Sequence, residues 1–177
     1  MKKIILGVSS SIAAYKACDL TRLFVKAGYS VHCVLTENAT HLVTPLTLET
    51  LSGNPVYTET FARERRAMGH IELKDDAALM VVAPATANIL GKFAGGIADD
   101  LLSTTFLSVL CPVVIAPAMN PNMWQHRAVR ENIAKLKSWG VRFVEPSEGA
   151  VACGDFGYGK LAEVDTIYRV AVDVLEG

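Results

Sequence analysis

Apolar positions along the chain form short continuous runs that alternate with segments of helical spacing. The continuous runs predict buried strands, which cover residues 3–8, 30–35, 78–83, 112–116 and 142–144. Apolar residues three and four positions apart predict helices, which cover residues 12–27, 44–51, 99–110, 127–139 and 164–175. In the first predicted helix, the spacing assigns the buried face to Ile12, Leu20, Leu23, Phe24 and Ala27.

Strands that are apolar on both faces and alternate with helices are typical of a parallel sheet covered on both sides. We therefore predict an α/β fold, a Rossmann-like (flavodoxin-like) three-layer sandwich with a central parallel sheet. The least regular segments are residues 58–69 and 145–160. Long loops in a compact domain are often functional, so both segments are candidates for a role in a site.

Length, composition and charge narrow the class of protein. The chain has 177 residues, 51% of them hydrophobic, and a formal net charge of −1 from 17 Lys+Arg and 18 Asp+Glu. This length suits a single domain, which we expect to cover residues 1–177. The apolar fraction excludes a disordered chain. The charge balance excludes a general nucleic-acid-binding protein, since no dense basic run occurs beyond Arg63–Arg66.

Cysteine usage indicates a reducing compartment and no metal centre. The cysteines are scattered without a CxxC pair, at Cys18, Cys33, Cys111 and Cys153. The uncharged stretch 101–125 is interrupted by three prolines, so a buried helix and strand are expected there instead of a membrane span. The N-terminal apolar run is too short for a signal peptide. We expect a cytoplasmic protein without membrane contact.

Small or polar residues follow four of the predicted strands, at 9–11, 36–38, 84–88 and 117–120. Ligands of parallel sheets bind beyond the carboxyl ends of the strands, beside helix N-termini. Helix capping explains any one of these loops, whereas four together favour a phosphate-bearing ligand. The first loop lacks the GxGxxG fingerprint, and the chain has no Gly-Lys-Ser/Thr P-loop. A mononucleotide such as FMN fits these features.

Five motifs occur in order along the chain. They are the opening motif Gly7–Lys16, the histidine motif His70–Leu73, the loop motif Ala83–Asn88, the PxMNxxMW motif Pro117–Trp124 and the Cys-containing segment Ala152–Lys160. In this order they resemble the phosphopantothenoylcysteine decarboxylases, within the family of homo-oligomeric flavin-containing cysteine decarboxylases. The resemblance covers essentially the whole chain. One departure is Ser10, which stands where many members have glycine and alters the backbone approach to a flavin phosphate.

The resemblance implies FMN-dependent decarboxylation of 4′-phosphopantothenoylcysteine to 4′-phosphopantetheine in coenzyme A biosynthesis. A cysteine carboxylate has no adjacent electron sink, so oxidation of the thiol to a thioaldehyde precedes the loss of CO2. Reduced flavin then returns the electrons to the enethiolate. Bacterial members are often fused to a C-terminal ligase. Because this chain ends at Gly177, we expect the decarboxylase half, with a possible separate phosphopantothenate-cysteine ligase.

The resemblance also assigns roles to individual residues. His70 is the candidate base at the oxidation step, although its position alone would suit a structural loop histidine. Cys153 is the candidate proton donor, in a glycine-rich segment that closes over substrate. The expected substrate contacts are Asn120, Ala152 and Lys160, with helix capping as the alternative for Asn120 and solvation for Lys160. The expected FMN contacts are Ser9, Ser11, Thr36, Thr86, Ala87, Asn88 and Ala118.

The resemblance further implies a homotrimer, or a dodecamer of trimers, with an active site that borrows residues from a neighbouring chain. Three alternative functions stay open. The nearest is a peptidyl-cysteine decarboxylase of lantibiotic maturation. A flavin prenyltransferase would not be expected to carry the His70 or PxMNxxMW motifs. A non-catalytic flavoprotein regulatory subunit usually has long acidic extensions, and retention of His70 and Cys153 favours activity.

Overall fold

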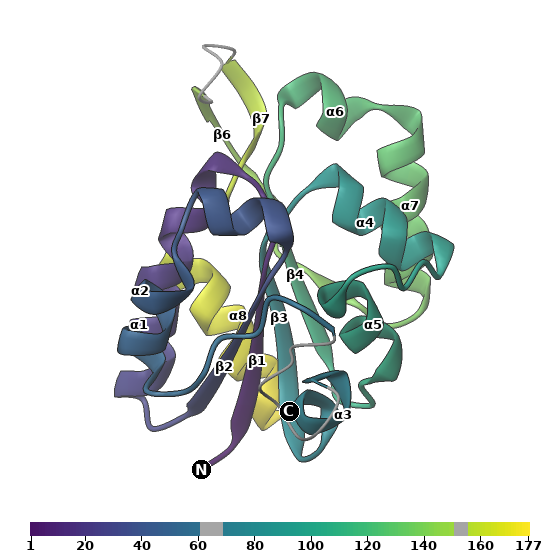
Figure 1. Cartoon of the computed structure of the whole chain (residues 1–177). Coiled ribbons are helices and arrows are strands. Elements are labelled where there is room, and N and C mark those ends of the chain that lie inside the picture. Colours follow the sequence, from purple (N-terminus) through teal and green to yellow (C-terminus); the bar gives the residue numbers. More distant parts are fainter. Residues whose placement is uncertain (61–68, 151–155) are drawn as a thin grey trace.

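A five-stranded parallel sheet forms the centre of the computed structural model, which describes residues 1–60, 69–150 and 156–177. Its strand order is β2-β1-β3-β4-β5, with bounds β1 Lys3–Val8, β2 Ser30–Leu35, β3 Ala77–Ala85, β4 Val113–Pro117 and β5 Arg142–Phe143. Neighbouring strands pair in parallel. Helices cover both faces of this sheet (Figure 1). The predicted three-layer α/β sandwich is confirmed.

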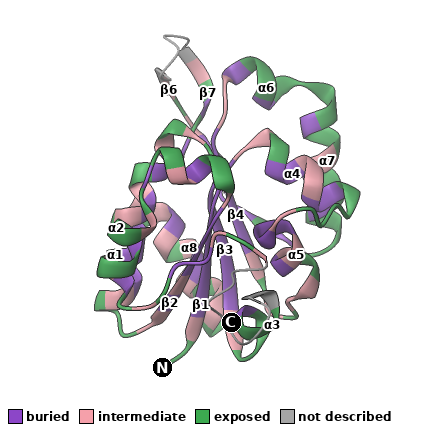
Figure 2. Cartoon of the chain, in the orientation of Figure 1, coloured by how far each residue is buried: buried purple, intermediate pink, exposed green. Residues whose placement is uncertain are grey.

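Each face of the sheet packs against its own group of helices. One core contains buried side chains of α1 (Lys16–Lys26), α2 (Pro45–Ser52) and α8 (Val164–Glu176). The opposite core contains those of α4 (Ala87–Gly95), α5 (Leu101–Ser108) and α7 (Arg127–Ser138). Figure 2 shows the strands buried between these layers. A strand covered on both faces needs apolar residues at every position, which explains the continuous runs in the sequence.

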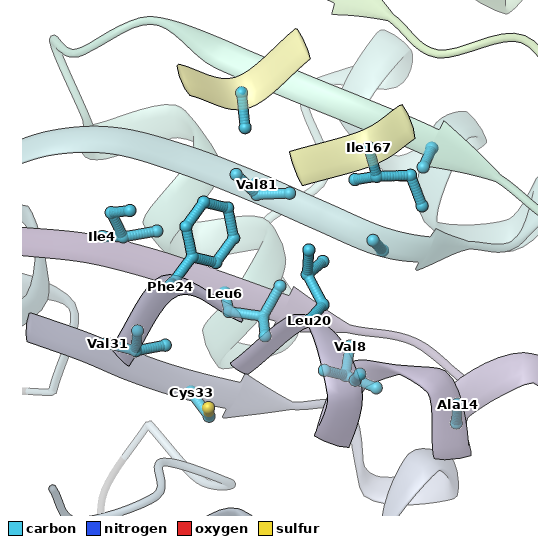
Figure 3. Packing of buried hydrophobic residues seen from close by; sticks show 14 of the residues in the cluster. Ile4, Leu6, Val8, Ala14, Leu20, Phe24, Val31, Cys33, Val81 and Ile167 are labelled. Carbon is cyan, nitrogen blue, oxygen red and sulfur yellow. The ribbon is translucent and has the colours of Figure 1, made fainter. Parts of the chain in front are cut away.

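Residues of one strand alternate between the two cores. Ile4 and Leu6 of β1 belong to the core with α1, whereas Ile5 belongs to the opposite core. Phe24 of α1 is fully buried, and Figure 3 shows it beside Ile4 and Val81. Burying an aromatic ring of this size contributes about 2–3 kcal/mol relative to leaving it exposed. The period-two alternation therefore decides which helix each strand residue meets.

The predicted helix at 12–27 is two elements. A 3₁₀ helix, η1 (Ile12–Tyr15), precedes α1. Its tighter turn breaks the 3.6-residue periodicity, and Ile12 is 61% exposed. Ala27, beyond the end of α1, is exposed as well. The assignment of Ile12 and Ala27 to the buried face was therefore wrong, while Leu20 and Phe24 are buried as predicted.

Several elements were not predicted. Helix α4 follows the loop that ends β3. An antiparallel hairpin of β6 (Ser147–Ala150) and β7 (Phe156–Lys160) lies where an irregular segment was expected. The remaining short elements are η2 Glu37–His41, α3 Gly69–Lys74 and α6 Pro121–Gln125. The hairpin projects beyond the carboxyl ends of the strands (Figure 1).

Helix α3 lies at the opposite, amino end of the sheet (Figure 1). The ammonium group of Lys3, at the start of β1, donates to the backbone oxygens of Glu72 at 2.5 Å and Asp75 at 3.0 Å. These bonds hold the end of α3 beside the first residue of β1. Since β1 has six residues, α3 is separated from the carboxyl edge of the sheet by about 20 Å.

In the part of the chain that the structure describes, no helix is both long enough and apolar enough to cross a membrane. The uncharged stretch 101–125 contains α5, β4 and α6, so the helix and strand predicted there are confirmed.

Candidate functional site

A cavity of about 520 Å³ opens at the carboxyl edge of the sheet. The strand order reverses between β1 and β3, and this is the point at which open α/β sheets bind ligands. The volume lies within the range of small-molecule and cofactor sites. The described lining residues are Ser10, Ser11, Ile12, Ala13, Tyr15, Lys16, Thr86, Ala87, Ala118, Met119, Asn120, Met123, Gly159, Lys160 and Leu161.

Ser9 joins the two strands at this reversal point. Its hydroxyl donates to the Pro84 backbone oxygen at 2.8 Å and accepts from the Thr86 N–H at 2.9 Å. Its own N–H also donates to the Pro84 oxygen, at 3.2 Å. Ser9 is 1% exposed and is absent from the described residues that line the cavity. Its observed contacts therefore position Thr86 at the cavity wall.

Replacement of Ser9 by alanine is expected to lower the free energy of unfolding by about 1–3 kcal/mol, because the partly buried Thr86 N–H loses its acceptor and the buried bond to the Pro84 oxygen is lost. Urea-induced unfolding measures this change. The matched control is Ser138→Ala, whose exposed hydroxyl donates to Lys135 and whose loss should cost less than about 0.5 kcal/mol. Equal stabilities of the two variants would contradict this reading of Ser9.

Two hydroxyl residues at the cavity cap helices. The Ser11 hydroxyl accepts from the Ala13 N–H at 3.3 Å, at the start of η1. The Thr86 hydroxyl accepts from the Ile89 N–H at 3.3 Å, at the start of α4. The capping alternative considered for these loops is thus confirmed. Capping does not exclude ligand binding, because the first N–H groups of a helix have no intrahelical acceptor and favour anions.

Asn120 begins α6 and contributes to the cavity wall. Its Oδ1 accepts from the Asn122 N–H at 2.8 Å. The amide therefore caps this helix, which confirms the capping alternative given for Asn120. The bond fixes the orientation of the side chain. Beside it, the Met119 N–H donates to the Gly159 oxygen at 2.9 Å, which docks β7 against the loop after β4.

This docking requires glycine at position 159. Gly159 has φ +146°, and a Cβ added there would lie 2.2 Å from the Met119 backbone oxygen. No side chain fits at that distance. The absence of a side chain therefore lets the hairpin form one wall of the cavity.

The structure brings together six of the predicted ligand contacts at the cavity: Ser11, Thr86, Ala87, Ala118, Asn120 and Lys160. Thr36 and Asn88 are absent from its described lining. Asn88 is exposed on α4. The Thr36 hydroxyl is buried without a hydrogen-bond partner among the described residues, and its N–H donates to Val8 at the same sheet edge. The binding roles of all these residues stay predictions.

The predicted catalytic residues are not brought to the cavity within the described chain. His70 lies in α3, at the far end of the sheet, and its side chain is outside the described structure. Ala152 and Cys153 fall in the segment 151–155, outside the described residues. Their roles as base, substrate contact and proton donor stay predictions.

Sequence reasoning missed several cavity residues, among them Ile12, Tyr15, Lys16 and Met123. The first three belong to the opening motif, so that motif could have indicated this wall of the cavity. Met123 is 46% exposed at the cavity. Its neighbour Trp124 is 6% exposed and belongs to the core.

The other cysteines have the character of structural thiols. Cys33 is fully buried, and burial raises its pKa to about 12. Cys18 and Cys111 are half-buried, and burial raises the pKa of each thiol. A thiol needs a lowered pKa to act as a nucleophile near neutral pH. These three cysteines therefore do not have the environment of reactive groups.

The remaining histidines are structural or exposed. His126 caps α7 by accepting from the Ala128 N–H at 3.2 Å. His41 is exposed. His32 is half-buried, and burial, with a smaller effect of Lys3, lowers its pKa. None of the three is among the described residues that line the cavity.

Comparison with known proteins links this geometry to a family. The family model described as Flavoprotein matches residues 1–176. The coenzyme A biosynthesis bifunctional protein CoaBC of Bacillus subtilis is 49% identical over 171 residues, 96% of this chain and 42% of that protein. The chain thus spans about two fifths of the length of such bifunctional relatives. The probable phosphopantothenoylcysteine decarboxylase of Streptococcus mutans is 43% identical over 171 residues, 95% of this chain and 96% of that protein.

Solved structures agree with this relationship. A mutant PPC decarboxylase complexed with pantothenoylaminoethenethiol has a TM-score of 0.90 and 31% identity, over 99% of this chain and 98% of that chain. The FMN-dependent cysteine decarboxylase SpaF has a TM-score of 0.85 and 33% identity, over 99% and 97%. The chain therefore belongs to the flavoprotein family that includes the phosphopantothenoylcysteine decarboxylases and related FMN-dependent cysteine decarboxylases.

Proposed function

We propose that this chain is an FMN-dependent carboxy-lyase that converts 4′-phosphopantothenoylcysteine to 4′-phosphopantetheine in coenzyme A biosynthesis. The observation that carries this proposal is the cavity at the reversal point between β1 and β3, lined by the loops of the recognised motifs. The similarity of this chain to the probable phosphopantothenoylcysteine decarboxylase of Streptococcus mutans covers 95% of the chain, and its similarity to the solved PPC decarboxylase covers 99%. Residues 1–177 act as one flavoprotein domain in this proposal.

The residues at the cavity fit FMN. Ser11 and Thr86 cap helices whose first N–H groups lie at the cavity edge, an arrangement that favours a phosphate. The Thr36 hydroxyl lies at the same sheet edge, outside the described lining of the cavity. It is buried without a partner in the described structure, and an unpaired buried hydroxyl is costly. Small side chains at Ala87 and Ala118 leave room for a flat ring. When bound, FMN supplies the two-electron oxidation of the substrate thiol and the later return of these electrons.

Asn120 orients the substrate in this proposal. An asparagine amide has one acceptor oxygen and two N–H donors. The oxygen accepts from the Asn122 N–H, and this bond orients the amide at the cavity wall. A substrate carboxylate accepts from such donors. Holding the carboxylate beside the flavin aligns the bond that breaks when CO2 leaves.

A second copy of the chain supplies His70 in this proposal. The cavity and α3 lie at opposite ends of β1, about 20 Å apart, so His70 and Asn120 of one chain cannot contact the same substrate. A ring with heterologous interfaces, such as a trimer, places one surface of each chain against a different surface of its neighbour. Such an assembly, a homotrimer or a dodecamer of trimers, completes each site with His70 of the neighbouring copy as the base.

A separate ligase and cytoplasmic localisation also stay predictions.

The function is tested by incubating the FMN-loaded protein with phosphopantothenoylcysteine and identifying the product by mass spectrometry. We expect yellow protein that releases FMN on denaturation, and formation of CO2 and 4′-phosphopantetheine. A peptide with a C-terminal cysteine is the comparison substrate, and turnover of the peptide alone would assign the enzyme to peptide modification. A colourless protein that fails to bind added FMN would contradict the cofactor assignment.

A further inference from the structure

Two adjacent lysines at the start of the sheet each contact the end of a different helix. The Lys2 ammonium group donates to the Leu175 backbone oxygen of α8 at 3.1 Å. The Lys3 ammonium group donates to the backbone oxygens of Glu72 and Asp75, at the end of α3. The buried side chains of α8 and α3 belong to opposite cores. Each lysine therefore holds a helix on one face of the sheet.

The contacts of Lys3 lie where a positive charge is favourable. The last carbonyl oxygens of a helix have no intrahelical donor, and the helix dipole places negative partial charge at this end. The Glu72 oxygen belongs to α3, and the Asp75 oxygen belongs to the turn between α3 and β3. In that turn Asp76 has φ +57°, a left-handed conformation that commonly ends a helix. Lys3 therefore holds the end of the helix and the turn together.

Helix α3 has little else to fix its position. It has six residues, and a helix of that length is not stable on its own in water. Among its described side chains, residues 71–74, only Leu73 is buried, in the core that contains α5. Ile71 is 41% exposed. The two bonds from Lys3 therefore matter for where this helix lies.

We propose that Lys3 is a positioning residue for His70. His70 is the second residue of α3, and Glu72 follows two residues later in the same helix. Because a helix this short moves as a unit, a bond at its end also sets the place of its start. The inference rests on the proposed function, in which His70 acts as the base. Misplacement of a catalytic group by about 1 Å costs up to about 10²-fold in rate.

The test compares Lys3→Met with Lys2→Met in the FMN-loaded protein. Both variants lose an ammonium group at a helix end, but only Lys3 holds the helix that carries His70. We expect Lys3→Met to lower kcat for phosphopantothenoylcysteine by about tenfold, with a KM within about twofold of the parent value, because the cavity is unaltered. Lys2→Met should leave kcat unchanged. Equal losses in the two variants, or no loss in Lys3→Met, would overturn the positioning role.

Two further variants separate positioning from general support of the fold. Lys3→Arg should recover most of kcat, since a guanidinium group also donates to carbonyl oxygens. Adding Lys3→Met to His70→Asn should lower the residual single-turnover rate by less than about twofold, because the base is already absent. A further tenfold loss in that double variant would show that Lys3 acts by another route. A thermal unfolding scan checks that each variant is folded.

Amide hydrogen exchange distinguishes this inference from the proposed function. Lys3→Met should speed exchange by about threefold in α3, and Lys2→Met should do so only at the end of α8. Unchanged exchange in α3 would contradict the hold of Lys3 on this helix. If the parent protein did not release CO2 while exchange in α3 responded to Lys3→Met, the proposed function would fail and the contact would stand.

Discussion

His70→Asn is expected to retain bound FMN and to lose decarboxylation by at least about 10²–10⁴-fold, the usual contribution of a positioned general base. Asparagine keeps a similar size and polarity but cannot accept the proton. Single-turnover release of CO2 from phosphopantothenoylcysteine measures the loss, and the flavin absorbance measures cofactor retention. Full turnover in this variant would contradict the role of His70.

The same variant tests whether the base comes from a second copy. Asn120→Ala damages the cavity, and α3 lies about 20 Å from that cavity in the same chain. When differently tagged His70→Asn and Asn120→Ala chains are co-expressed and mixed trimers are purified through both tags, about one third of the sites combine an intact cavity with an intact histidine. We therefore expect recovery of about a third of the parent activity.

The control for this recovery is a mixture of two differently tagged His70→Asn chains, which should stay inactive. Mixed oligomers of His70→Asn and Asn120→Ala that remain as inactive as either variant alone would contradict a shared site. That result would not contradict the assignment of the FMN cavity. It would mean that His70 of a neighbouring copy is not the base that acts on the bound substrate.

Gly159→Ala is expected to lower the free energy of unfolding by about 3 kcal/mol and to weaken substrate binding. The new Cβ would lie 2.2 Å from the Met119 oxygen, and the backbone has φ +146°. Both the contact and the dihedral angle disfavour a side chain. Relief of the contact moves β7 away from the loop that carries Asn120, so the cavity loses one wall. Chemical unfolding and the KM for phosphopantothenoylcysteine report the two effects.

The Gly140→Ala variant distinguishes the cost of a left-handed dihedral angle from the cost of the steric contact at Gly159. Gly140 has φ +89°, and a Cβ there has no atom within 4 Å. Its replacement should cost about 1 kcal/mol, the typical cost of a side chain in a left-handed conformation, with an unchanged KM. A Gly159→Ala variant that matches Gly140→Ala in both measurements would contradict the docking role of Gly159.

The strands of the sheet could be predicted closely because their signal is local. Strands β1 and β2 have the predicted bounds, since residues buried on both faces must all be apolar. Helix α2, between Thr44 and Gly53, could be predicted equally well, because a capping threonine and a left-handed glycine mark its ends. Helix α4 was missed, since Gly91 and Gly95 weaken its helical pattern.

The hairpin β6–β7 could not be predicted for a different reason. Glycine disfavours strands when it is judged by propensity alone. Gly157 and Gly159 occur in β7 because the strand approaches the 119–121 loop too closely for a side chain. That contact joins segments about 40 residues apart in the sequence, and no local pattern reports it. Lys3 was overlooked for the same reason, since its two acceptors lie 69 and 72 residues away in the sequence.

The sequence by itself determined the strands of the parallel sheet, five of the helices and the edge at which polar loops gather, because periodicity and capping act between residues close along the chain. Only the tertiary structure decided the strand order, which makes Ser9 a link between β1 and β3 and sets α3 at the far end from the cavity. The pairing of distant strands depends on packing between whole elements and leaves no local periodicity. For this reason the motifs indicated a base and a substrate amide, whereas only the fold shows that α3 and Asn120 lie at opposite ends of the sheet.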